Sequence, residues 1–120
     1  MSKLTKAATL ARQMLRTAEP FENRLRLVCI AVAAEFMVPI HLIVGHKHHA
    51  RLVEARHIAI GLCRELCPDV STGKIAQEFG RDSASVRYAV KRYGEMKAAR
   101  RKSTAALAAK LGVSVEAAAE

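Results

Sequence analysis

The residues with the most informative chemistry lie in the segment STGKIAQEFGRDSASVRYAVKRY, residues 71–93. Ser71 can cap a short helix, and Gly80 suits a tight turn with a positive φ angle, which costs little only for glycine. Asp82 or Ser83 can cap the next helix. The inward positions of both helices are apolar: Ile75, Ala76, Phe79, Val86, Ala89 and Val90. This spacing predicts two helices that cross steeply about a short turn, the helix-turn-helix pattern.

The outward residues of this segment suit duplex DNA. Residues 73–102 include nine basic and three acidic side chains, and a recognition helix enters the major groove with its N-terminal turn. Arginine can bond guanine, aspartate can accept from cytosine, alanine can contact a thymine methyl group, and serine can bond a base or a phosphate. The predicted DNA contacts are therefore Arg81, Asp82, Ser83, Ala84, Ser85, Arg87 and Lys91. The alternative is a solvated basic face on a structural helix pair.

Composition narrows the class of partner. The chain has 120 residues and a formal charge of +9, which favours nucleic acid. Aromatic residues make up only 4% of it and Trp is absent, which argues against modules that stack single-stranded bases on exposed rings. The longest charge-free apolar stretch, residues 27–34, is too short to span a bilayer, so no membrane partner is expected. Three cysteines among apolar neighbours predict a reduced, cytosolic compartment.

Catalytic and metal chemistry have little support in the sequence. No GxxxxGK[ST] or GxGxxG motif occurs, so neither a nucleotide nor another cofactor is predicted. Glu65 lacks the companion residues of a general base, and we expect no enzyme activity. Three histidines in the loop 46–51 raise a zinc hypothesis, but Cys63 and Cys67 lack the spacing of a zinc-binding loop and lie beside core-type leucines. Buried thiols and a basic loop are the favoured interpretation.

Helical periodicity covers nearly the whole chain, and no run alternates with period 2, so the fold is predicted to be all-α. Ser2 can cap the first helix, and Pro20 and Pro68 interrupt the helical pattern. Before residue 71, helices are expected at about 2–17, 21–36, 40–44 and 52–66. The core-facing positions of the second and fourth of these are Leu25, Val28, Cys29, Val32 and Phe36, and Ala55, Ile58, Ala59, Leu62, Cys63 and Leu66.

Residues from about 24 to 96 resemble the C-terminal DNA-binding domain (domain IV) of the bacterial replication initiator DnaA. The matching stretches are LVCIAVAAEFMVPIHLIVG, EARHIAIGLCREL and KIAQEFGRDSASVRYAVKR. In the second stretch Arg56-His57-Ile58-Ala59 fits the family's Arg-Gln-hydrophobic-Ala, and Arg64-Glu65-Leu66 fits its Lys-Glu-Leu. The resemblance implies a Trp-repressor-like helix-turn-helix bundle with extra N- and C-terminal helices, and double-stranded DNA as its partner. The resemblance also implies five further DNA-binding residues: Lys47, His48, Arg51, Arg56 and Arg64.

The departures from the family pattern concern specificity. The family signature continues Arg-Asp-His-Thr-Thr-Val, whereas residues 81–86 read RDSASV. Ser83 and Ala84 replace the His-Thr pair that reads thymines, so the target is expected to differ from the initiator's box. The family's arginine-rich minor-groove loop matches HKHHAR at 46–51, and because histidine gains charge toward about pH 6, weaker and pH-sensitive contacts are expected. Without the AAA+ ATPase domain, the chain is not expected to initiate replication alone.

The sequence suggests three parts: an N-terminal helix at 1–19, the DNA-binding domain at 20–99 and a C-terminal helical tail at 100–120. The first part is a packing helix, a partner or oligomer helix, or a membrane-surface segment. The last resembles the start of another helix-turn-helix, a helix ended by glycine, or a docking element for a partner protein.

The predicted function is sequence-specific transcriptional regulation in the cytoplasm, at the nucleoid, with RNA polymerase or a co-activator as protein partner. The resemblance implies phage-derived or gene transfer agent genes as its context. The alternatives are a replication accessory or phage/plasmid replication factor, and a non-specific nucleoid-type binder.

Overall fold

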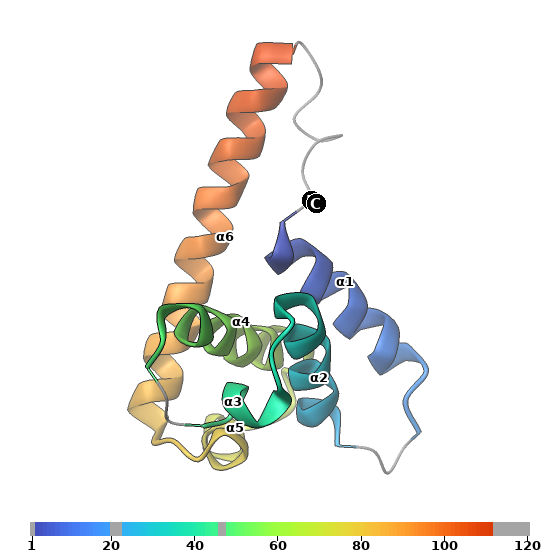
Figure 1. Cartoon of the computed structure of the whole chain (residues 1–120), viewed down its shortest axis with the longest axis vertical. Helices are drawn as coiled ribbons and strands as arrows, with labels where there is room; N and C mark the ends of the chain where they lie inside the picture. Colours follow the sequence, from blue (N-terminus) through green and yellow to red (C-terminus); the bar gives the residue numbers. More distant parts are fainter. Residues whose placement is uncertain (1, 20–22, 46–47, 112–120) are drawn as a thin grey trace.

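The chain folds into helices joined by short connections, as a computed structural model shows for residues 2–19, 23–45 and 48–111 (Figure 1). The helices are α1 (Lys3–Arg16), α2 (Arg24–Phe36), α3 (Ile40–Ile43), α4 (Ala50–Leu66), α5 (Thr72–Phe79) and α6 (Ser83–Leu111). No strand occurs within those ranges, and the predicted all-α fold is confirmed.

Side-chain caps set several helix starts. Ser2 Oγ accepts from Thr5 N at 3.2 Å and Asp82 Oδ1 accepts from Ser85 N at 2.7 Å, which satisfies backbone donors in the first turns of α1 and α6. Asn23 Oδ1 accepts from Leu25 N at 3.1 Å, so α2 begins at Arg24 rather than near 21. The imidazole Nδ1 of His49 accepts from Arg51 N at 3.3 Å, so α4 begins at Ala50, two residues before the predicted start.

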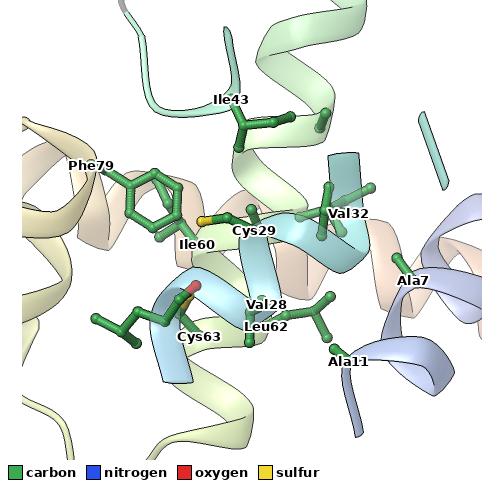
Figure 2. Packing of buried hydrophobic residues seen from close by; sticks show 14 of the residues in the cluster. Ala7, Ala11, Val28, Cys29, Val32, Ile43, Ile60, Leu62, Cys63 and Phe79 are labelled. Carbon is green, nitrogen blue, oxygen red and sulfur yellow. The ribbon is translucent and has the colours of Figure 1, made fainter. Parts of the chain in front are cut away.

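The hydrophobic core lies where α1, α2 and α4 pack together and α5 closes one side (Figure 2). α1 contributes small residues, Ala7 and Ala11, which allow a close approach to α2. All five positions predicted for the core face of α2 are buried, and so are those predicted for α4 except Leu66, which is half-buried. The central side chains in Figure 2 come from α2, α4 and α5: Val28, Cys29, Val32, Ile60, Leu62, Cys63 and Phe79.

Helix α6 is the longest element, and its second half extends beyond the packed helices (Figure 1). It runs without a break through residues 99 and 100, where the sequence predicted a boundary between the DNA-binding domain and a tail. Arg100 Nε donates to Thr5 Oγ1 at 2.9 Å and so joins α6 to the first turn of α1. Farther along, Leu107 and Leu111 are 57% and 67% exposed. The turn expected after Leu111 lies outside the described residues.

Glu65 connects three helices. Its carboxylate accepts from Lys97 Nζ at 2.5 Å and from the Tyr93 hydroxyl at 3.2 Å, both on α6. Arg12 on α1 is 3.4 Å away. Burial raises the pKa of Glu65, but the Lys97 hydrogen bond and charge, the Tyr93 hydroxyl and the Arg12 charge outweigh it, so the pKa lies below its usual value.

Among the described residues, no helix has the length and apolarity needed to cross a membrane.

Candidate nucleic-acid interface

Helices α5 and α6 meet at the sharp turn that the sequence predicts. Gly80 adopts φ 61°, in the left-handed region, and ends α5. Arg81 N then donates to Ala76 O at 2.9 Å, which closes the turn. The predicted inward positions of both helices are buried, except Val90, which is half-buried. The turn therefore fixes the first half of α6 against α5 and α4 and leaves its other face to solvent.

The solvent face of α6 carries basic and small side chains over its first turns. Ala84, Arg87 and Lys91 are exposed, while Ser83 and Ser85 are half-buried. Asp82 caps the helix. The hydrogen bonds from Ser85 lower the pKa of Asp82, and the nearby charges of Arg87 and Arg81 lower it further. This face suits a polyanion because cations line it and the helix N-terminus adds partial positive charge.

Arg81 and Arg56 both donate to backbone carbonyls at the end of α3. The Arg81 guanidinium is half-buried, and its Nη2 donates to the carbonyl of Gly45 at 2.8 Å. Arg56 is 3% exposed. Its Nε donates to Ile43 O at 2.8 Å and its Nη2 to Leu42 O at 3.0 Å. In this structure α4 therefore turns the Arg56 side chain inward against the end of α3, and its contact with DNA stays a prediction.

The other predicted basic residues differ in what their side chains contact. Arg64 is half-buried and donates to backbone carbonyls between α4 and α5, among them Pro68 O at 3.0 Å and the carbonyl of Val70. Arg51 is exposed and donates to the carbonyl of Phe36. His48 is exposed beside the start of α4. Lys47 lies outside the described residues.

One candidate on this face was not predicted from the sequence. Tyr88 follows Arg87 and is 57% exposed, and its ring packs edge-on against His57 of α4 at 5.7 Å between ring centroids. Burial lowers the pKa of His57, and the charges of Arg92, Arg56 and Arg81 lower it further. The helical register could have indicated Tyr88. Val86 and Ala89 face the core, and Tyr88 lies between them in sequence on the exposed side of the helix. A phenol at this place supplies a hydroxyl that can bond a phosphate.

The cysteines and histidines do not assemble a metal site in the described part of the chain. No group of three or more His, Cys, Asp or Glu side chains there is arranged to hold a metal ion. Cys29, Cys63 and Cys67 are free and buried. The hydrogen bond with Cys29 and, after it, burial raise the pKa of Cys63, which keeps this thiol protonated.

This arrangement of α5, its glycine turn and the basic face of α6 defines an all-helical helix-turn-helix protein. The chain belongs to the bacterial DnaA helix-turn-helix family, whose model matches residues 26–92. The predicted resemblance over about residues 24–96 is thus confirmed. In DnaA, this helix-turn-helix is the non-catalytic DNA-binding domain, and it binds double-stranded DNA.

A curated relative gives the same relationship. The chain is similar to the chromosomal replication initiator protein DnaA of Mycobacteroides abscessus, with 40% identity over 93 residues. The match covers 73% of this chain and 19% of the relative. The chain therefore spans about a fifth of the length of the initiator that it matches. No solved structure matches the chain.

Proposed function

We propose that this protein is a sequence-specific transcriptional regulator that acts at the nucleoid by binding duplex DNA through α5 and α6. The observation that carries the proposal is the exposed face of α6, where Ala84, Arg87 and Lys91 stand outward next to the glycine turn. In this arrangement Arg87 and Lys91 bind phosphates, while Asp82, Ser83 and Ala84 approach base edges. Near the start of α4, His48 and Arg51 add a second, basic contact.

The residues at the base-reading positions support a target of its own for this protein. Ser83 and Ala84 are smaller than the histidine and threonine of the family signature, so they offer shorter reach and fewer donors to the major groove. We infer that the bound sequence differs from the initiator's box. The exposed leucines of the α6 extension, Leu107 and Leu111, support an added protein contact, for which we propose RNA polymerase or a co-activator.

The direct test is a gel-shift series with a selected duplex and a scrambled duplex at several salt concentrations. Arg87→Ala and Lys91→Ala should weaken binding to both duplexes and reduce the salt slope by about one unit each, as expected for phosphate contacts. Ser83→Ala should instead change the preferred sequence. Lys6→Ala, which removes an exposed charge of α1, is the matched control and should change neither quantity.

Two other outcomes point to other functions. Equal affinity for the selected and the scrambled duplex would support a non-specific nucleoid-type binder. The relative is a chromosomal replication initiator, so a replication accessory or a phage/plasmid replication factor is the second candidate. Selection of a duplex that matches the initiator's box would favour this candidate over a promoter or operator of its own.

A further inference from the structure

Two arginines, one in α4 and one in the turn between α5 and α6, meet at the end of α3. Arg56 of α4 donates to the carbonyls of Leu42 and Ile43, and Arg81, the first residue after the glycine turn, donates to Gly45 O at 2.8 Å. The end of α3 is thus held from the α4 side and from the helix-turn-helix side together. Arg81 and its partner Gly45 are 36 positions apart in the chain.

These contacts satisfy backbone groups that a helix end otherwise leaves without partners. The last carbonyls of a helix have no intrahelical donor, and α3 has only four residues. Ile43 is fully buried, so water does not serve its carbonyl as it does at an open helix end. Arginine suits this position because its planar fork bonds several acceptors while keeping its charge.

The bonds also place a DNA-facing segment. The connection from α3 to α4 leads from Gly45 to His48, His49 and the start of α4, while Arg81 stands at the start of the recognition helix α6. We propose that Arg81 and Arg56 are positioning residues that hold the end of α3 and Gly45 beside the start of α6, so that DNA contacts from α6 and from His48 and Arg51 share one geometry. The inference rests on the DNA binding proposed above.

The local energetics agree with a role in geometry more than in stability. Arg81 Nε is buried and has no hydrogen-bond partner among the described residues. Burial and the charge of Arg81 lower the pKa of Arg56. An unpartnered buried donor and two neighbouring like charges both disfavour the folded state. Replacing Arg81 by a neutral side chain therefore removes these costs together with the bond to Gly45, so the fold should survive the change.

A double-mutant cycle tests the inference. One variant is Arg81→Gln, and the second is His48→Gln with Arg51→Gln, which removes two of the basic side chains near the start of α4 and keeps the His49 cap. If Arg81 acts through this segment, each variant loses about tenfold in affinity for the selected duplex, and the combined variant also loses about tenfold rather than about a hundredfold. Arg87→Gln is the matched control, and its loss should multiply with that of the second variant.

A readout without DNA separates positioning from direct contact. In the free protein, Arg81→Gln should shift the backbone amide resonances of residues 44, 45, 48 and 49 and leave those of residues 86–91 nearly unchanged. Arg56→Lys, which keeps the charge but loses the fork, should shift the same four resonances. The melting temperature of each variant establishes that it is folded.

The possible failures are distinct. A wild-type protein that binds no selected duplex more tightly than a scrambled one contradicts the proposed sequence-specific function. If the wild type binds specifically but the losses of Arg81→Gln and of the second variant multiply, Arg81 contacts DNA directly and the positioning role is wrong. The same conclusion follows if the four resonances do not move, or if His48→Gln with Arg51→Gln binds like the wild type.

Discussion

His57 is the residue at which burial and neighbouring charge combine most clearly. It lies half-buried on α4 against the Tyr88 ring, and burial together with Arg92, Arg56 and Arg81 lowers its pKa. In the unfolded chain a histidine takes up a proton near pH 6.5, whereas the folded protein does so only at lower pH. The unfolded state therefore binds more protons in that interval, and stability falls as the pH drops through it.

We predict that His57→Gln flattens this loss of stability between about pH 6.5 and 5. Urea unfolding at several pH values, with the free energy of unfolding plotted against pH, measures the effect. His41→Gln, at an exposed position of α3, is the control and should keep the wild-type slope. An unchanged slope in His57→Gln would assign the pH dependence in this interval to other groups.

At the scale of elements, Glu65 ties α4 to α1 and α6. Because its pKa lies below the usual value, its contribution to stability is present above about pH 4.5 and is lost as the pH falls through the folded-state pKa. Glu65→Gln should lower the free energy of unfolding by about 1 kcal/mol at pH 7, a typical value for charged hydrogen bonds near a surface. Urea titrations should show the difference from wild type shrinking toward pH 3. Glu54→Gln, exposed on the same helix, should have little effect at either pH.

The crossing of α4 and α6 depends on a glycine. A Cβ atom added at Gly61 would lie 2.1 Å from Cγ of Tyr93, whose ring is buried between the helices. The clash involves the part of the ring nearest the backbone, which cannot swing away. Gly61→Ala should therefore destabilise the protein by about 1–3 kcal/mol, as overpacking does elsewhere.

Gly94, one residue after Tyr93, is the matched control for Gly61. Nothing lies within 4 Å of a Cβ added there, and the residue is inside α6. Gly94→Ala should raise the free energy of unfolding by about 0.5–1 kcal/mol, because alanine loses less backbone entropy in a helix. Thermal or urea unfolding of the two variants compares them directly. If both alanine substitutions shift the free energy of unfolding in the same direction, the close crossing of α4 and α6 is not what excludes a side chain at residue 61.

The helix-turn-helix could be predicted because its determinants are local. The side chains of Ser71 and Asp82 each accept from a backbone N–H three residues further along the chain. Gly80 ends α5 by donating to the carbonyls of Ala76 and Gln77, in the preceding helical turn. The partners of Arg56 and Arg81 lie 13 and 36 residues away along the chain, so only the folded chain brings them together. A basic residue near a DNA-binding motif looks the same in sequence whether its guanidinium faces solvent or a buried carbonyl. Burial alone separates Arg87 from Arg56.

At the scale of the whole molecule, α6 has two parts with different surroundings. Its first half packs on α4 and α5 and carries the DNA-facing residues, and Arg100 makes its hydrogen bond to α1. Beyond Arg100, the described part of the helix exposes Leu107 and Leu111 one turn apart on one face. An isolated helical extension gains little stability from the rest of the fold. These leucines are therefore candidates for binding a partner protein rather than for holding the DNA-binding core together.

Removing residues 103–120 should leave DNA affinity within about twofold of wild type, because the segment carries one lysine against two glutamates and lies beyond the recognition turn. Transcription from the target promoter should be lost if polymerase or a co-activator docks there. Leu107→Ser with Leu111→Ser tests the same surface at full chain length, and Lys110→Ser is the control for an exposed residue of the same turn. Gel shifts and a promoter-reporter assay measure both quantities in each variant.

Full regulation by the truncated protein would rule out docking through this part of α6. Altered origin firing with unchanged transcript levels after gene deletion would favour the replication role.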